Sequence, residues 1–305
     1  MKVFITGSTG LLGSALLRLA PSVHKLYASY NINTLVPNVL CDYRHMDITD
    51  AVEVEKVIGK IKPDVVIHTA AIATPDYCDK HQKEATAVNV GGTKNILAAC
   101  KKAGAKIIFI TTNGVYDGKK APYAEDAAAN PIDWYGKTKV EGEMLTEKSG
   151  VTYMIARLIT MYGWNNPRER QNPVTWQQVI LGENKTPLNM VSDMYNNFLY
   201  SDEAARAIWA AIERGTWGEK FNIAGKNCVS RYDFSVHIAR AFGHDTKMIY
   251  PVKMDYFKNF VPRPKNTCFV TKKMSQVLEV EPVSTSQGLK HMANHPLPIN
   301  AWRAL

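Results

Sequence analysis

The first twenty residues of the chain combine three local patterns in an order that few folds use. Residues 2–6, KVFIT, form a short β-branched and aromatic run that is typical of a buried strand. The glycine-rich segment GSTGLLG follows directly, and residues 11–19 then have the pattern of a helix that ends before Pro21. Strand, glycine turn and helix in this order are what a dinucleotide site requires. The sequence therefore predicts such a site at its N-terminus.

The three glycines have distinct expected roles there. Gly7 permits the tight turn, Gly10 lets the backbone approach a pyrophosphate, and Gly13 lets the helix pack close to the strand. The helix N-terminus adds free N–H groups and the positive end of its dipole. The spacing is GxxGxxG rather than GxGxxG, and an ordinary turn can also carry a glycine triplet. Its place after the first strand favours a cofactor site, with these candidate contacts: Gly7, Thr9, Gly10, Leu11 and Leu12.

Strand-like and helix-like segments continue to alternate along the chain. Further strands are expected at 25–30, 45–50, 64–68, 106–111 and 151–156, and helices at 51–61, 84–103 and 134–148. The strand at 45–50 should run into its helix through a cap at Thr49 or Asp50. This alternation predicts an α/β fold with a doubly wound parallel sheet of the Rossmann type.

The second half of the chain fits a smaller C-terminal α/β substrate lobe. Helices are expected at 173–181, 201–214 (capped by Ser201 or Asp202) and 231–242 (capped by Ser230), a strand at 221–224, and a mobile polar loop at 165–172. We expect a Rossmann domain over 1–157 and a lobe over 158–305, with segments around 188–214 returning to the first domain.

Composition excludes several classes of protein. The chain has 305 residues and 46% hydrophobic content, but no run approaches the length of a membrane span, and a strand begins too early for a signal peptide. Five scattered cysteines without a CxxC motif predict a reduced, cytoplasmic protein. The net charge of +9 is dispersed, which indicates a solvated surface rather than a nucleic-acid partner. A homodimer is compatible with the sequence, which does not fix the oligomeric state.

The second expected strand bears on the choice of cofactor. Proteins that prefer NAD hold the ribose 2′-hydroxyl with an acid near the end of this strand. Here the first acidic residue of the chain is Asp42, and Ser29 lies where the acid would be. A 2′-phosphate would not be repelled, so NADP(H) is favoured. No arginine follows directly to bind that phosphate, so NAD(H) stays open.

A second chemical pattern follows the strand at 106–111. Tyr135 and Lys139 are four residues apart and share one face of a helix. An adjacent ammonium would lower the pKa of the phenol, which could then exchange a proton with a carbonyl or hydroxyl oxygen. The hydroxyl of Thr112 could hold the same oxygen. An isolated YxxxK pattern usually consists of surface residues without a catalytic role, but its place after the fifth expected strand favours catalysis.

With these motifs the sequence resembles the extended short-chain dehydrogenase/reductase family, in particular the sugar-nucleotide branch typified by dTDP-4-dehydrorhamnose reductase. The resemblance covers nearly the whole chain. It rests on Gly7, Gly10, Gly13, Asp47, Ile48, Ala70, Ala71, Asn89, Thr112, Tyr135 and Lys139, on TTNGVYDG at 111–118, and on looser counterparts at 131–139, 157–163, 191–195 and 263–267.

The resemblance implies a role for each matching residue. Tyr135 would be the general acid, Lys139 would lower its pKa and hold the nicotinamide ribose, and Thr112 would bond the substrate oxygen. Further cofactor contacts would come from Asp47 and Ile48 near the adenine, Ala70 and Ala71 along the cofactor, and Asn89 near the active site. Substrate contacts would come from Thr112, Asn113 and Arg263, the last with Pro264 and Lys265 toward a diphosphate, although surface charge explains that run equally well.

The implied activity is an oxidoreductase of dTDP-rhamnose biosynthesis: an NADPH-dependent reductase of a nucleotide-linked 4-keto-6-deoxysugar. Asn113-Gly114 replaces the usual Asp-Tyr of that branch, and Thr160 replaces an aromatic residue, which leaves the sugar open. An NAD-dependent nucleotide-sugar epimerase is one alternative. A non-catalytic NADP-binding regulatory subunit, like that of methionine adenosyltransferase, is another. A dehydratase would need an Asp-Glu pair after the threonine.

Metal chemistry has little support in the sequence. His291 and His295 have the spacing of metal ligands on a helix, but no third ligand is evident. We therefore expect no metal site.

Overall fold

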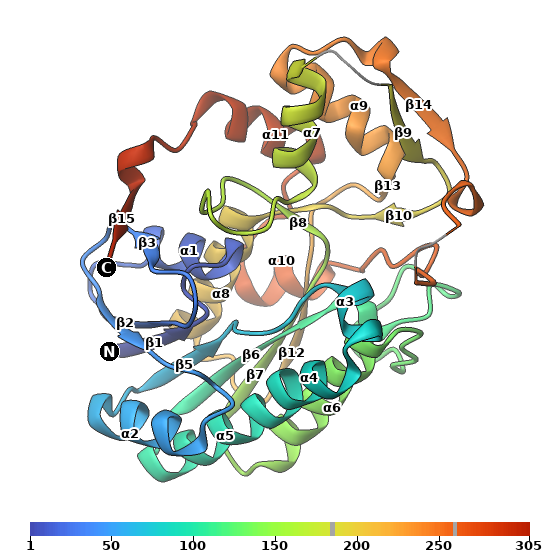
Figure 1. Cartoon of the computed structure of the whole chain (residues 1–305). Helices are drawn as coiled ribbons and strands as arrows, with labels where there is room; N and C mark the ends of the chain where they lie inside the picture. The colour runs from blue at the N-terminus through green and yellow to red at the C-terminus, as the bar shows by residue number, and fades with distance from the viewer. Residues whose placement is uncertain (184–186, 259–260) are drawn as a thin grey trace.

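The computed structural model describes residues 1–183, 187–258 and 261–305 of the chain. Its larger part is a seven-stranded parallel sheet between two layers of helices, with a smaller lobe at the carboxyl ends of the strands (Figure 1). The strands lie in the order β12 (Lys220–Ile223), β7 (Tyr153–Leu158), β6 (Lys106–Thr112), β5 (Val65–His68), β1 (Lys2–Thr6), β2 (Lys25–Tyr30) and β4 (Asp42–His45). The predicted doubly wound sheet is confirmed.

Each face of the sheet has its own apolar core because successive strand residues point to opposite faces. In β1, Phe4 joins the core under one helical layer, whereas Val3 and Ile5 join the core under the other. The first layer consists of α2 (Ala51–Ile61), α4 (Gln82–Thr86), η1 (Ala87–Gly91), α5 (Gly92–Ala103) and α6 (Trp134–Lys148). The second consists of α1 (Leu11–Arg18), α8 (Ser201–Arg214) and α10 (Lys272–Leu278).

The lobe is built from helices and short strand pairs around an aromatic core. Its helices are α7 (Pro173–Glu183), α9 (Arg231–Phe242) and α11 (Thr285–Asn294). Its strand pairs are β8 (Met161–Tyr162) with β11 (Leu199–Tyr200), β9 (Leu188–Val191) with β14 (Ile249–Val252), and β10 (Tyr195–Asn196) with β13 (Val229–Ser230). Phe198 and Phe234 stack in the core with ring centroids 3.7 Å apart.

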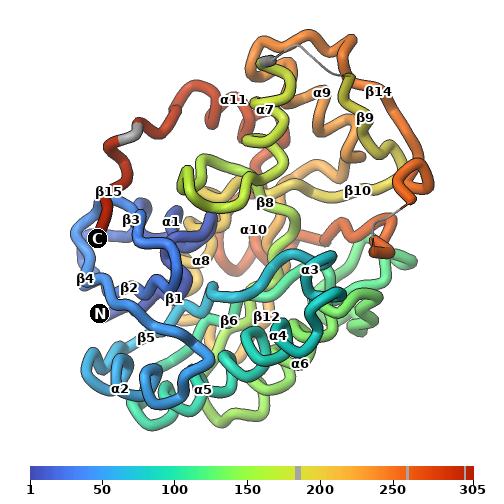
Figure 2. The backbone as a smooth tube through the Cα atoms, viewed as in Figure 1, coloured from blue at the N-terminus to red at the C-terminus, as the bar shows by residue number. Residues whose placement is uncertain are grey.

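Several short elements connect these parts. They are α3 (Pro75–Lys80) and the 3-10 turns η2 (Asn113–Val115), η3 (Thr246–Met248), η4 (Met254–Tyr256) and η5 (Ile299–Ala301). The C-terminal strand β15 (Trp302–Ala304) returns to pair with β3 (Leu35–Pro37), which brings the two ends of the chain near one edge of the molecule (Figure 2).

Two sequence predictions of local structure were wrong. The third strand lies at 42–45 rather than 45–50, because the Asp47 carboxylate accepts the backbone N–H of Thr49 and forms a turn there. Asp50 caps α2 as expected, accepting from Val52 and Glu53. The predicted cap of α8 by Ser201 or Asp202 is not made, since Tyr200 holds the N-cap position without a side-chain bond.

Residues 188–214, for which we expect a return to the first domain, contact two parts of the molecule. The first part, β9, pairs with β14. The last part, α8, packs on α1, and β12 further along the chain pairs in parallel with β7 at the edge of the main sheet.

The expectation of fully reduced cysteines was wrong. Cys228 and Cys268, 40 positions apart, form a disulfide. The pairing arises because β10 lies between two partners, with Tyr195 opposite Ser230 on one side and Asn266 on the other. The predicted cytoplasmic location rested on reduced cysteines and stays a prediction. Among the residues that the structure describes, no helix is long and apolar enough to cross a membrane.

Candidate active site

Thr112 and Tyr135 meet where β6 ends and α6 begins. The helix approaches closely because it carries glycines at the contact: a Cβ on Gly136 would lie 2.2 Å from the Gly114 carbonyl oxygen. The N-terminus of α6 is held by the buried carboxylate of Asp133, which accepts from the Gly136 N–H at 2.7 Å. As a result, the side chains of Tyr135 and Thr112 are hydrogen-bonded. The structure thus brings together two of the three predicted catalytic groups.

Lys139, the third group, is buried one turn further along α6. Its Nζ lies 4.3 Å from the ring centroid of Phe109, and the residue is 4% exposed. Burial lowers the pKa of Lys139 to about 8, and the charge of Glu143 opposes this only in part. The ammonium is therefore easier to deprotonate than that of an ordinary lysine.

The pKa of Tyr135 shifts in the direction opposite to the sequence prediction. Burial raises it to about 12, and the hydrogen bond with Thr112 only partly opposes that effect. The charges that act on Tyr135 are those of Cys78, Asp133 and Arg170, and Lys139 is not among them. The phenol is thus protonated at neutral pH, as a proton donor must be.

The glycine turn has the features of a dinucleotide site. Gly7 adopts a φ of +64°, and Gly10 has room beside it, since a Cβ there would meet only the Gly7 carbonyl oxygen at 3.5 Å. A Cβ on Gly13 would lie 2.3 Å from that same oxygen, so α1 can pack on the turn only with glycine at this position. Within the part of the chain that the structure describes, no side chain caps α1, and the buried hydroxyl of Ser8 has no hydrogen-bond partner. These free donors fit a pyrophosphate.

Two of the other predicted cofactor residues, Ala70 and Ser29, contact this turn. A Cβ on Gly7 would lie 2.9 Å from the Ala70 backbone, so Ala70 and Ala71 run alongside the turn. Ser29 is buried at the end of β2, where its carbonyl accepts the Ser8 N–H at 3.0 Å. Ile48 packs against Gly92.

The amide of Asn89, a predicted cofactor contact, makes its hydrogen bonds within the protein. Its Oδ1 accepts the Ile72 N–H at 2.8 Å, and its Nδ2 donates to the Ile72 carbonyl at 3.0 Å and to Thr138 at 3.1 Å. Asn89 thus links the loop after β5 to α6, which makes it a positioning residue.

On the lobe side, Asn113 joins the two parts of the molecule. Its Nδ2 donates to Thr267 at 2.5 Å and to Asn196 at 3.1 Å. Asn196 and Thr267 were not among the predicted site residues. Thr267 lies in the run at 263–267 that the resemblance had marked, whereas nothing in the local sequence distinguishes Asn196.

The chain also carries two arginines, Arg263 and Arg231, whose guanidinium charges act on one another. Arg263 pairs with Asp76 of α3, but its buried Nη1 has no hydrogen-bond partner among the described residues. The same holds for the buried Nε of Arg231, at the start of α9. Burial, and then the charge of Arg263, lower the pKa of Arg231 to about 10. Unsatisfied donors on two adjacent cations are suited to an anion such as a diphosphate. Arg231 was not predicted from the sequence, because nothing in its local sequence distinguishes it from an ordinary first residue of a helix.

His291 and His295 stack with ring centroids 4.3 Å apart on α11 and just beyond it. Among the residues that the structure describes, no group of three or more His, Cys, Asp and Glu side chains could hold a metal ion.

Comparison with known proteins gives consistent results. The profile of the RmlD substrate binding domain family matches residues 1–297. A dTDP-4-dehydrorhamnose reductase of Aggregatibacter actinomycetemcomitans is 26% identical over 302 residues, covering 95% of this chain and 98% of the relative. The methionine adenosyltransferase 2 subunit beta of Mus musculus is 31% identical over 276 residues, covering 87% of this chain and 79% of the relative.

A solved structure from Clostridium acetobutylicum, described as a dTDP-4-dehydrorhamnose reductase, superposes with a TM-score of 0.83. It is 29% identical to this chain, and the alignment covers 96% of this chain and 99% of the other.

Proposed function

The chain belongs to the RmlD substrate binding domain family, and we propose that it is an NADPH-dependent reductase of a nucleotide-linked 4-keto-6-deoxysugar. The observation that carries this proposal is the hydrogen-bonded pair of Thr112 and Tyr135, with the buried Lys139 one turn further along the same helix. The pair lies at the carboxyl edge of the sheet, where doubly wound folds bind their ligands.

NADP(H), with NAD(H) as the alternative, would supply the hydride when bound on the glycine turn. Tyr135 would donate its proton to the keto oxygen as charge develops there, and Thr112 would hold that oxygen in place. The pKa of about 12 keeps Tyr135 protonated until that step. Lys139, with a pKa of about 8, is the nearby group from which the phenolate could regain a proton. Arg231 and Arg263 would bind the substrate diphosphate.

The non-catalytic alternative has one observation in its favour, the 31% identity with a methionine adenosyltransferase subunit. The presence of Thr112, Tyr135 and Lys139 favours catalysis instead. The same three groups are compatible with an NAD-dependent epimerase, which the serine at the end of β2 disfavours.

The test is NADPH oxidation by the purified protein with a dTDP-linked 4-keto-6-deoxy-L-hexose, with NADH in parallel. We expect turnover that falls at least about 1,000-fold in Tyr135→Phe, because the proton donor is lost while the ring remains. Tyr250→Phe is the matched control, since Tyr250 is 49% exposed on β14 in the lobe. Its turnover should equal that of the wild type.

Tight NADPH binding without oxidation would reject this substrate class. Measurements of epimerase activity and of binding to a partner protein would then separate the two alternatives.

A further inference from the structure

A segment of the lobe reaches across to the predicted cofactor domain. Residues 163–172, which we name the strap, join β8 to α7 and appear as the yellow-green loop that extends from β8 toward β3 and α1 (Figures 1 and 2). Its base is closed by Asn172, whose Nδ2 donates to the Gly163 carbonyl at 2.7 Å. Asn166 donates to the Leu35 carbonyl in β3 at 2.5 Å. The strap is thus anchored at both ends.

The strap also contacts the loop after β5. Arg170 donates to the Thr74 hydroxyl at 2.9 Å, and its charge acts on Tyr135. Strap contacts therefore extend from the segment after β2 to the loop after β5, and the charge of Arg170 acts as far as Tyr135.

Glu169 makes the contact that matters most. Its Oε1 accepts a hydrogen bond from the Thr9 hydroxyl at 2.7 Å and another from Asn33 Nδ2 at 3.0 Å. Thr9 belongs to the glycine turn, and Asn33 lies three residues after the end of β2. One carboxylate oxygen therefore bridges two loops that are more than a hundred residues away from it in the sequence.

The position of the Glu169 Oε1 atom bears on which dinucleotide the site would prefer. In doubly wound dinucleotide sites the pyrophosphate lies on the glycine turn, and an acid near the end of the second strand holds the ribose 2′-hydroxyl. The chain has no acidic residue before Asp42. The fold nevertheless brings a carboxylate to this place, from the opposite domain.

We propose that Glu169 is a specificity-determining residue that reduces the preference for NADPH over NADH. Its carboxylate opposes a 2′-phosphate and can accept a hydrogen bond from a 2′-hydroxyl. This inference rests on the proposed function for the dinucleotide site itself and adds the residue that discriminates at its 2′ end. It reverses the simplest interpretation of β2, in which the absence of an acid leaves the 2′-phosphate unopposed.

The test is the affinity of the purified full chain for NADPH and NADH, measured by fluorescence titration without substrate. In Glu169→Gln we expect NADPH to bind about tenfold more tightly, since one charge pair near a protein surface is worth on the order of that factor in Kd. NADH should bind equally well or more weakly. Glu169→Ala should show the same change, which separates loss of the charge from a new bond between the Gln amide and the phosphate.

Two controls complete the experiment. Glu169→Asp keeps the charge and should keep the wild-type ratio of the two Kd values. Glu141→Gln removes a charge from an exposed position on α6 and should change neither Kd.

The outcomes separate the two proposals. Equal changes for NADPH and NADH, or no change in the Gln and Ala variants, would overturn the role of Glu169 while leaving the reductase proposal intact. Failure of the wild-type chain to bind either nucleotide would instead reject the proposed function.

Discussion

Helix α6 places two buried charged groups one turn apart, and their surroundings are opposite. Lys139 lies over the ring of Phe109, and its pKa is lowered to about 8 by burial. Glu143 lies against Arg157, where burial acts to lower the pKa of the guanidinium, but the hydrogen bond and charge of Glu143 more than offset it, so that the pKa is raised.

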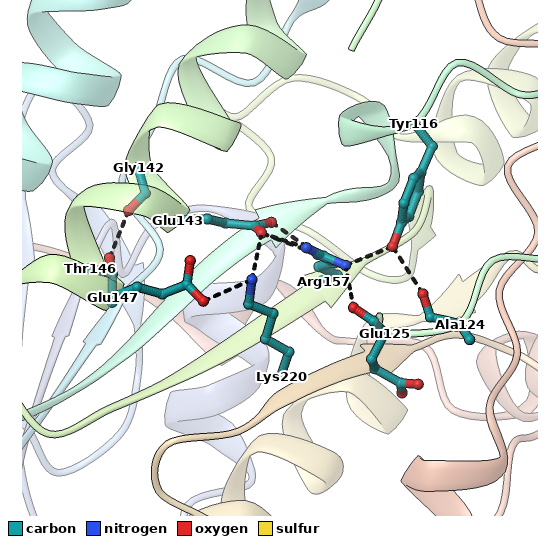
Figure 3. A network of polar contacts seen from close by, with 9 residues as sticks. All are labelled: Tyr116, Ala124, Glu125, Gly142, Glu143, Thr146, Glu147, Arg157 and Lys220. Carbon is teal, nitrogen blue, oxygen red and sulfur yellow. Dashed lines mark hydrogen bonds and ion pairs between the residues drawn. The ribbon is translucent and has the colours of Figure 1, made fainter. Parts of the chain in front are cut away.

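The Glu143 side is a complete network (Figure 3). Arg157 Nε and Nη2 donate to the two carboxylate oxygens at 3.0 and 2.6 Å, and Nη1 donates to the Tyr116 hydroxyl at 2.6 Å and to the Glu125 carbonyl at 3.0 Å. Lys220 of the edge strand β12 adds a contact of 3.8 Å to Glu143. The network ties β7, α6 and the loop at 116–125 together.

The difference between the two sides separates structure from chemistry. A buried charge whose donors and acceptors are all satisfied fixes the position of its neighbours and has little tendency to change its proton. A buried lysine that lies over a ring face, with only a partly compensating carboxylate one turn away, is poised to exchange its proton near pH 8. The same helix thus carries a structural charge and the charge of the proposed catalytic lysine.

The largest effect is expected from Arg157→Met, which removes the cation of the Arg157–Glu143 pair. It leaves the buried Glu143 carboxylate without its hydrogen-bonded guanidinium and with only the weaker influence of Lys220 at 3.8 Å and of the Lys139 charge, so we expect a loss of about 3–5 kcal/mol in the free energy of unfolding. Urea unfolding curves measure this change. The double variant Arg157→Met/Glu143→Met should recover much of the loss, because the Glu143 carboxylate is no longer buried without its guanidinium partner. A double variant as unstable as the single one would contradict the assignment.

Lys139→Met should lower activity without lowering stability, the reverse of what we expect for Arg157→Met. We expect turnover of the ketosugar to fall about 100-fold, in line with loss of a group that assists proton transfer. The midpoint of thermal unfolding should be equal to or higher than that of the wild type, because a costly buried charge is removed. Parallel steady-state kinetics and thermal melts measure both effects. A large loss of stability would place Lys139 among the structural charges.

The smallest expected effect is the change of kcat/KM and of folding stability with pH as Lys139 loses its proton. The ammonium is lost as pH rises through about 8, so kcat/KM should fall about tenfold for each pH unit above that value. Because the folded-state pKa lies below the ordinary value of 10.5, the unfolded chain binds more protons between pH 8 and 10.5, and folding stability should rise with pH across that window. Lys139→Met should abolish the rise. A flat wild-type stability profile would mean that the lysine is not buried in solution.

Much of the fold followed from local sequence patterns. The bounds of β2 and α6 agree with prediction, and Asp50 and Ser230 cap their helices as expected. These features depend on alternation, periodicity and capping chemistry, which act over a few residues. The errors at 45–50 and at Ser201 occurred at element ends, where several nearby polar side chains compete for the same backbone groups.

The candidate site was predictable only in part. Thr112, Tyr135 and the glycine turn could be selected because each follows a strand in a recognisable order. Arg231 and Asn196 could not, since their significance arises from neighbours that are distant in the sequence. The direction in which the pKa of Tyr135 shifts could not be predicted from the sequence either. The extent of burial decides that direction, and the spacing to Lys139 does not.

The sequence by itself determined the succession of strands and helices along the chain, the glycine turn and the candidate site residues Thr112 and Tyr135, because these depend on short-range spacing. Tertiary structure alone decided which charges are satisfied and which are not. It paired Arg157 with Glu143, joined Cys228 to Cys268, and brought Glu169 to Thr9 and Asn33. The physical reason is that desolvation and hydrogen-bond partners are properties of a position in space, which the folded chain alone defines.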